Sequence, residues 1–288
     1  MMKRLRIWMI VGFLLVGLPF LADEAIATQK ENTPVEKKGN APIPKEKAPA
    51  ATRTVIPPSV LNIAKENTYP NSTQDLPYLQ PSEFAQSLID TSKIKIENPE
   101  LIHMLNESAV GKAPFSFGYR ATIYLGHWAL NYQSSETAPN WEYQKINTNF
   151  FDNRANLTPH PIHYVQEMQK LVRGGLTAKI PSSPDVQKMM LIKAAEKTNL
   201  PLAFETIIGG ATKKDQVYNI PARRLGYLNA YASAINEKGK VTYGEVYVIL
   251  KGSKRSLLIK NITSQGIGAW IPVQDHLSFN FNASEQPR

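Results

Sequence analysis

The stretch Leu277-Ser-Phe-Asn-Phe-Asn282 has an apolar residue at every second position, with Ser or Asn between. Successive side chains of a β-strand point to opposite faces, so this alternation predicts a strand with one buried and one solvated face. The same period runs from Phe115 to Leu125. After Gly126 the apolar positions shift by one residue, which predicts a bulge or a tight turn there.

Further apolar runs in the C-terminal half extend this sheet. Val241–Leu250 is apolar on both faces, which predicts a central strand. Turns are predicted at Asn236-Glu-Lys-Gly239 before it and at Lys251-Gly-Ser-Lys254 after it. Strands joined by short turns pair in the antiparallel sense. Other strands are predicted around residues 141–146, 202–208, 225–231 and 257–259.

Helical patterns occur in separate blocks between the strand patterns. Ser82 is placed to cap a short helix over residues 83–89, and Asn98-Pro99-Glu100 is typical of a second helix start. Apolar spacings of three and four predict helices over residues 162–172 and 185–199, the latter capped by Ser183 with Pro184 at its first position. Blocks of helices and strands that do not alternate predict an α+β fold, an antiparallel meander-type sheet with several short helices packed on it.

Residues 1–27 have the order of a secretory signal peptide. Lys3, Arg4 and Arg6 precede an uncharged run over residues 7–21, and Ala25 and Ala27 then form a small-x-small cleavage pattern. A spanning helix needs about 20 apolar residues, more than this run supplies. We therefore expect a secreted or cell-envelope protein outside the cytoplasm. The alternative is retention by an uncleaved N-terminal anchor.

Residues 28–57 predict a disordered, basic tether. They hold six basic and three acidic side chains and five prolines, with few large apolar residues. Such a segment cannot bury enough apolar surface to offset the entropy lost on ordering. The predicted organisation is a signal peptide over 1–27, a tether over 28–57 and a single globular domain over 58–288.

The amino-acid composition excludes several chemistries. The chain has no Cys, so thiol nucleophiles, thiolate metal sites and disulfides are excluded, and an exported protein without disulfides favours a Gram-positive bacterial host. The formal net charge of +9 suits contact with anionic wall polymers or with lipid head groups at a membrane periphery, and also serves ordinary solubility. Export argues against nucleic acid as a partner.

Catalytic signals are sparse. The sequence lacks Gly-x-Ser-x-Gly, His-Glu-x-x-His, a phosphate-binding loop and a dinucleotide glycine triplet, and we expect no cofactor. Glycan cleavage needs two carboxylates in one site, for which the candidate acids are Glu136, Glu142, Asp152 and Glu205. His160 and His163, three residues apart on a predicted helix, are candidate metal ligands, although Pro161 between them favours ordinary surface histidines.

Aromatic and basic residues supply the candidate binding groups. Aromatic side chains with Arg120 nearby could form a platform for sugar rings or could simply pack a sheet face, and Arg154 joins them as a candidate contact. The aromatic set is Tyr119, Tyr124, Trp128, Tyr132, Trp141 and Tyr143. The basic pairs Lys213-Lys214, Arg223-Arg224 and Lys254-Arg255 could contact phosphate-rich polymers or be ordinary turn residues.

Several long strings resemble the YfkD-like family of exported, functionally uncharacterised proteins from Bacillus-type bacteria. They are Gly118-Tyr-Arg-Ala-Thr-Ile-Tyr-Leu-Gly-His-Trp-Ala-Leu-Asn-Tyr132, Asn140-Trp-Glu-Tyr-Gln-Lys-Ile-Asn-Thr-Asn149, Asp152-Asn-Arg154, Gly175-Leu-Thr-Ala-Lys-Ile-Pro181 and Leu200-Pro-Leu-Ala-Phe-Glu205. The resemblance covers about residues 57–283. It implies an envelope location in a Gram-positive cell, and it supplies no activity or catalytic residue to transfer.

These observations favour a non-enzymatic envelope protein that contacts an anionic wall polymer or another envelope protein. One alternative is an envelope hydrolase or transferase that acts on wall glycan through paired carboxylates. Another is an exported folding helper or inhibitor that binds a protein partner by strand addition at a sheet edge.

Overall fold

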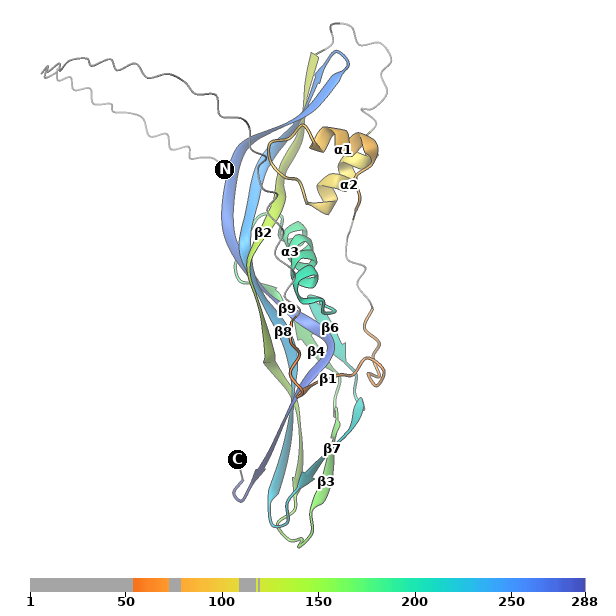
Figure 1. Ribbon diagram of the computed structural model, residues 1–288, viewed down its shortest axis with the longest axis vertical. Helices are drawn as coiled ribbons and strands as arrows, with labels where there is room; N and C mark the ends of the chain where they lie inside the picture. The colour runs from red at the N-terminus through yellow and green to blue at the C-terminus, as the bar shows by residue number, and fades with distance from the viewer. Residues whose placement is uncertain (1–53, 73–78, 109–117, 119, 288) are drawn as a thin grey trace, which may run out of the picture. The chain divides into compact units, whose positions relative to one another are not determined.

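The computed structural model describes residues 54–72, 79–108, 118 and 120–287, all of which belong to one compact unit, Pro49–Arg288 (Figure 1). The predicted signal peptide, with Ala25 and Ala27, lies outside the described residues, as does nearly all of the predicted tether. The signal, tether and domain boundaries therefore stay predictions. Within the described part of the chain, no helix is long and apolar enough to cross a membrane.

Three very long antiparallel strands form the framework of this unit. They are β2 (Arg120–Asp152), β8 (Leu225–Lys251) and β9 (Lys254–Ser284). The sheet order is β1-β9-β8-β2, with β1 (Val60–Asn62) on one edge and β5 (Gly175–Leu176) also paired to β9. The predicted α+β class is confirmed, and the central strand is β8, as predicted.

Two turn predictions around β8 have opposite outcomes. The predicted turn at Lys251–Lys254 is confirmed, because β8 and β9 join there as a hairpin. The predicted turn at Asn236–Gly239 is wrong, because these residues pair with β2 on one side and with β9 on the other. Local turn propensity yields here to pairing with two neighbours. A Cβ on Gly239 would lie 2.5 Å from the Tyr132 hydroxyl, so the glycine makes room for that ring.

Register shifts let β2 follow the twisted sheet without a break. The predicted irregularity at Gly126 is confirmed by a shift between Tyr124 and Gly126, and four more shifts follow along the strand. The separate strand predicted around residues 141–146 is therefore the second half of β2. The first residues of the predicted strand, 115–117 and Tyr119, lie outside the described part of the chain.

Residues 162–172 form two short strands, so the predicted helix there is wrong. The strand β3 (His160–Val165) pairs with β7 (Lys213–Ile220), and β4 (Lys170–Arg173) pairs with β6 (Glu205–Ile208). Ile162 and Tyr164 are buried and the flanking Pro161 and His163 are exposed. This period of two over β3 outweighs the helical spacing that also fits the apolar residues.

The three helices of the described residues begin close to their predicted starts. They are α1 (Glu83–Ile89), α2 (Pro99–Glu107) and α3 (Ser183–Thr198). Ser82 and Asn98 cap α1 and α2 by accepting hydrogen bonds from the backbone N–H groups of Ala85 and Glu100. The cap position of α3 is Ser182, one residue before the predicted Ser183.

Apolar side chains form three separate cores along the sheet. The helices α1 and α2 pack against one end, where Leu101, Val246 and Leu257 are buried. The helix α3 packs against the middle, and the pairs β3–β7 and β4–β6 pack near the other end (Figure 1). The long strands are thus shared by all three cores, and two surface pockets lie where the core under α2 meets the core under α3.

Candidate functional site

A groove lies between α3, the segment that leads into α2, and the middle of β2. Lys193 and Lys197 lie four residues apart on α3, which places them on one face of the helix. Buried Val186 and Met190 precede Lys193 by seven and three residues on the same stripe of α3, and they pack this stripe against the sheet before the two lysines reach the groove. The remaining lining side chains are Lys95, Glu97, Asn131, Tyr132, Gln133 and Ser134, and the groove has a volume of about 440 Å³.

Ion pairs and hydrogen bonds arrange the three lysines of this groove. Glu97 binds the ammonium groups of Lys95 at 2.5 Å and Lys193 at 3.3 Å. Lys193 also pairs with Glu196 at 3.5 Å, whereas Lys197 donates a hydrogen bond to Ser134 Oγ at 2.7 Å. Lys197 has no carboxylate within ion-pair distance among the described residues, so its charge faces the groove without a neutralising partner.

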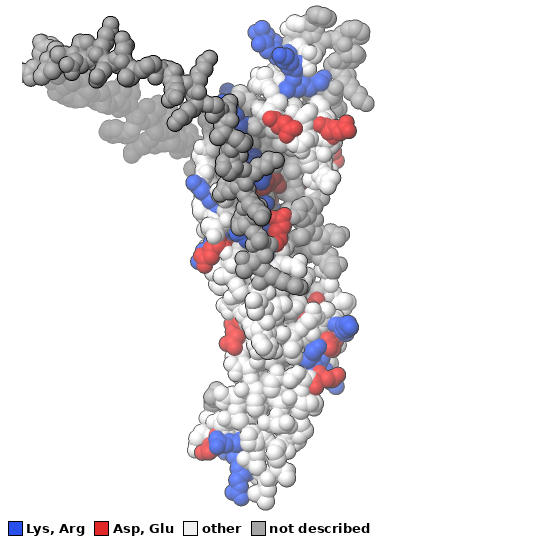
Figure 2. Space-filling model, in the orientation of Figure 1, with Lys and Arg blue, Asp and Glu red and all other residues white. Residues whose placement is uncertain are grey.

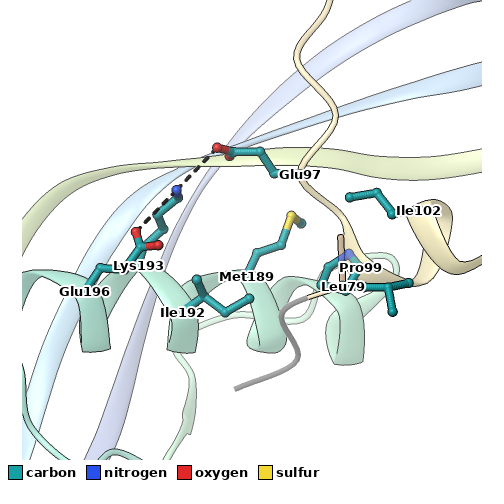
Figure 3. Close-up of a pocket in the computed structure, with 8 residues that line it drawn as sticks. All are labelled: Leu79, Glu97, Pro99, Ile102, Met189, Ile192, Lys193 and Glu196. Carbon is teal, nitrogen blue, oxygen red and sulfur yellow. Dashed lines mark ion pairs between the residues drawn. The ribbon is translucent and has the colours of Figure 1, made fainter. Parts of the chain in front are cut away.

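A smaller apolar pocket of about 190 Å³ adjoins the lysine groove and shares Glu97 and Lys193 with it. Figure 3 shows Lys193 lying between the carboxylates of Glu97 and Glu196, beside the side chains of Met189 and Ile192. Its other lining residues are Leu79, Pro99 and Ile102. The two spaces together offer an apolar end and a cationic end on either side of one ion-pair cluster.

The charge of Lys193 is secured by its surroundings. Burial by itself acts to lower the pKa of this ammonium group, because burial disfavours the charged form. The carboxylates of Glu97 and Glu196 outweigh that effect and raise the pKa above its ordinary value. Lys193 is therefore a permanent cation near neutral pH.

A hydrogen-bonded chain leads from the groove to a fully buried carboxylate. Glu237 on β8 accepts hydrogen bonds from Tyr132 OH at 2.9 Å and from Thr137 Oγ1 at 2.5 Å. Thr137 Oγ1 lies 3.3 Å from Ser134 Oγ, the partner of Lys197. Burial, and then the Glu237 carboxylate, raises the pKa of Tyr132, so this hydroxyl stays a donor.

Comparison with known proteins assigns the family. The family model described as "YfkD-like protein" matches residues 57–288. The chain belongs to the YfkD-like family. It is 62% identical over 233 residues to "Uncharacterized protein YfkD" of Bacillus subtilis (strain 168), a match that spans 81% of this chain and 88% of that protein. The predicted family is confirmed, and neither name states an activity.

In this member of the YfkD-like family, the four candidate acids have separate partners. Glu136 pairs with Lys238 at 3.0 Å, Asp152 with Arg154 at 2.8 Å and Glu205 with Arg173 at 3.0 Å. Glu142 Oε1 accepts a hydrogen bond from Asn280 at 3.4 Å. The hydrogen bond from Arg154 lowers the pKa of Asp152. These contacts lie on the surface, and none of them joins two of the carboxylates.

The aromatic candidates are divided between different surroundings. Trp128 donates from Nε1 to the Leu125 carbonyl at 2.9 Å and packs beside α1 and α2. Tyr132 is buried against α3, where the half-buried Trp141 also packs. Tyr143 stacks on Trp270 with centroids 5.2 Å apart, whereas Tyr124 is exposed. Sheet packing therefore accounts for most of this set.

The basic and histidine candidates also lie apart. Arg120 is exposed at the start of β2, and Arg154 is exposed in its pair with Asp152. His160 stacks on Phe151 with centroids 3.7 Å apart, whereas His163 is exposed. An odd separation of three along a strand places the two imidazoles on opposite faces. The part of the chain that the structure describes has no cluster of three or more metal-ligating side chains.

Of the groove residues, Tyr132 was a candidate binding residue from the sequence, and the others were not identified. They come from residues 95–97, 131–134 and 193–197, which carry no joint motif and meet only through tertiary packing. Two signals were nevertheless present, the i,i+4 lysine pair on α3 and the acidic residue within the predicted turn, Glu237. Neither signal shows by itself that the residue faces a groove or is buried.

Proposed function

We propose that this protein is a non-enzymatic binding module of the cell envelope that holds a segment of an anionic, phosphate-containing polymer in the lysine groove. The observation that carries the proposal is the ammonium group of Lys197, which faces a 440 Å³ groove with a hydroxyl as its partner and no carboxylate in range among the described residues.

The charge balance of the groove supports a ligand that presents one negative charge at a time, as each unit of a phosphodiester polymer does. Three lysines and the two carboxylates of Glu97 and Glu196 leave an excess of one cation. A phosphodiester unit carries one negative charge and needs hydrogen-bond donors of this kind. The adjoining apolar pocket accommodates a less polar part of the same ligand. The predicted export signal and the basic tether are consistent with an anionic partner outside the cytoplasm.

The test is sedimentation with purified cell-wall material from the host at low ionic strength. Because surface electrostatics are screened by salt, we expect binding that weakens as the ionic strength rises. The variant Lys197→Gln is expected to bind at least several-fold more weakly, and Lys193→Gln with Lys197→Gln more weakly still. Lys197→Gln is informative by itself because it breaks no ion pair.

A matched control separates the groove from net charge. Lys145 and Lys179 are exposed and lie outside the groove, so Lys145→Gln with Lys179→Gln removes the same charge elsewhere. This control is expected to bind nearly as the unsubstituted protein does. Equal loss in the control and the groove variants would attribute binding to net charge. Unchanged binding of the groove variants would refute the proposed function.

A further inference from the structure

The register of the three long strands brings three cations together in one row at the end of the sheet. Arg120 on β2 pairs with Lys251 on β8, and Lys251 pairs with Lys254 on β9. Residues directly opposite each other in antiparallel strands share one face of the sheet. The three side chains therefore form a cationic row across the sheet. Figure 2 shows basic side chains gathered at this end of the described unit.

This basic row lies on the face that α1 and α2 leave uncovered. The helices pack against the row that contains Val248 and Leu257, which are both buried. The cationic row and the row Tyr124–Tyr247–Leu258 have the opposite parity, so they share the other face. Arg255, next to Lys254, points to the helix side, where its guanidinium lies 5.9 Å from the Phe84 ring centroid.

An apolar row lies four residues inward from the cations on the same face. Tyr124 is 55% exposed and Leu258 is 39% exposed. The rings of Tyr124 and Tyr247 lie 5.0 Å apart, and the Lys260 ammonium lies 5.1 Å from the Tyr247 centroid. An exposed, contiguous apolar strip bordered by cations at both ends marks a surface that another body contacts.

The cations of this face outnumber its acids. No carboxylate among the described residues pairs with Arg120, Lys251 or Lys254, as judged at ion-pair distance. The acid nearest the apolar row is Glu245, which accepts a hydrogen bond from Tyr247 OH at 2.7 Å. With Lys260 included, four cations face one carboxylate. The charge of the surface thus selects an anionic partner.

We propose that this face, defined by Arg120, Lys251 and Lys254 with Tyr124, Tyr247 and Leu258, docks onto the surface of an anionic phospholipid bilayer. Cations near such a surface are attracted by its negative potential, and tyrosine rings are favoured at the level of the head groups. The exposed tyrosine and leucine side chains decide between lipid and a soluble polyanion. A soluble polyanion would engage the cations and leave Leu258 in water, whereas a bilayer buries both rows. The proposal is independent of the lysine groove.

The test is co-sedimentation with phosphatidylglycerol vesicles and with phosphatidylcholine vesicles. The protein is purified from its host, so that it has the N-terminus that it carries there. Binding to the anionic vesicles only is expected. Each cation near an anionic membrane contributes about 1 kcal/mol, or roughly a fivefold factor, so Lys251→Gln with Lys254→Gln lowers the partition constant by roughly 25-fold. The control Lys145→Gln with Lys179→Gln removes the same charge elsewhere and is expected to bind as the unsubstituted protein does.

A second variant tests the apolar row. Tyr124→Ser with Leu258→Ser keeps every cation and is expected to weaken vesicle binding at high salt, where screening leaves the apolar contribution dominant. Equal binding to both vesicle types would overturn the proposal. It would also be overturned if Lys251→Gln with Lys254→Gln bound the anionic vesicles as the control Lys145→Gln with Lys179→Gln does. A third outcome would also overturn the proposal. If the protein bound soluble polyphosphate as strongly as the anionic vesicles, and if Tyr124→Ser with Leu258→Ser left that binding unchanged, the face would be assigned to a soluble polyanion.

Discussion

Replacing Tyr132 with Phe removes one of the two hydroxyl groups that bind the buried carboxylate of Glu237. The Tyr132 hydroxyl lies 2.9 Å from Glu237 Oε1, and Thr137 holds the other oxygen at 2.5 Å. Glu237 has no exposed surface and Tyr132 is 2% exposed. The substitution therefore leaves one carboxylate oxygen inside the protein without its donor while keeping the aromatic ring that fills the core.

The size of the effect follows from the cost of an unsatisfied buried acceptor. A hydrogen bond to a charged group contributes about 1.5–3 kcal/mol, and an orphaned buried polar atom costs about 1–3 kcal/mol. We expect Tyr132→Phe to lower the free energy of unfolding by about 2 kcal/mol. Urea unfolding measures this as a lower midpoint with an unchanged denaturant slope.

A double-mutant cycle isolates the contact from other effects of the substitution. In a Glu237→Met background the Tyr132 hydroxyl has no carboxylate to which it can donate. Tyr132→Phe is therefore expected to lower the free energy of unfolding by less than about 0.5 kcal/mol in that background. The isosteric Glu237→Gln provides a second background if the methionine variant does not fold. An equal cost of Tyr132→Phe with and without the carboxylate would refute the reasoning, because the destabilisation would then arise elsewhere.

Three further predictions test the stability of the fold. Thr206 Oγ1 is buried without a hydrogen-bond partner in the described structure. Thr206→Val is therefore expected to leave the free energy of unfolding unchanged or to raise it by up to about 1 kcal/mol. A clearly lower free energy of unfolding in urea would contradict this. A Cβ at Gly239 would lie 2.5 Å from the Tyr132 hydroxyl, so Gly239→Ala should cost about 1–3 kcal/mol in the same assay, whereas Gly175→Ala, with open space around it, should cost little. Burial raises the pKa of Tyr132 and Tyr164, so both stay protonated in the folded protein where the unfolded chain ionises. The contribution of these two raised pKa values to the free energy of unfolding is fully present below about pH 10 and is lost as the pH rises. The free energy of unfolding of Tyr132→Phe should therefore fall less steeply than that of the unsubstituted protein when it is measured from about pH 9 to 11.

The helices and strands that could be predicted from the sequence are those whose local residue pattern fits only one type of secondary structure. The caps at Ser82 and Asn98 specify the starts of α1 and α2 through hydrogen bonds within one turn. The run Val241–Leu250 was correctly predicted as a central strand, because β2 and β9 pair with its two edges, while the helices cover one of its faces, where Val246 and Val248 are buried. Gly252 lies in the hairpin with a φ of 61°, a conformation that glycine adopts without strain.

The wrong predictions share a tertiary cause. The apolar residues over 162–172 fit a helical spacing, but β7 and β6 supply strand partners that a helix could not use. At Asn236–Gly239 two neighbouring strands override a local turn preference. The groove likewise depends on three segments that meet only after folding, so the i,i+4 spacing of its two α3 lysines did not show that they face a groove.

The pairing of β2 with β8 has a consequence for the order of events during synthesis. Asp152 pairs with Leu225 and Arg120 pairs with Lys251, so every partner of β2 in this ladder is made long after β2 itself. Contacts between distant parts of a chain form slowly, and an unpaired strand edge invites association with other chains. Until β8 has been made, the β2 segment lacks a partner strand at both of its edges, and during that interval it is most open to association with other chains.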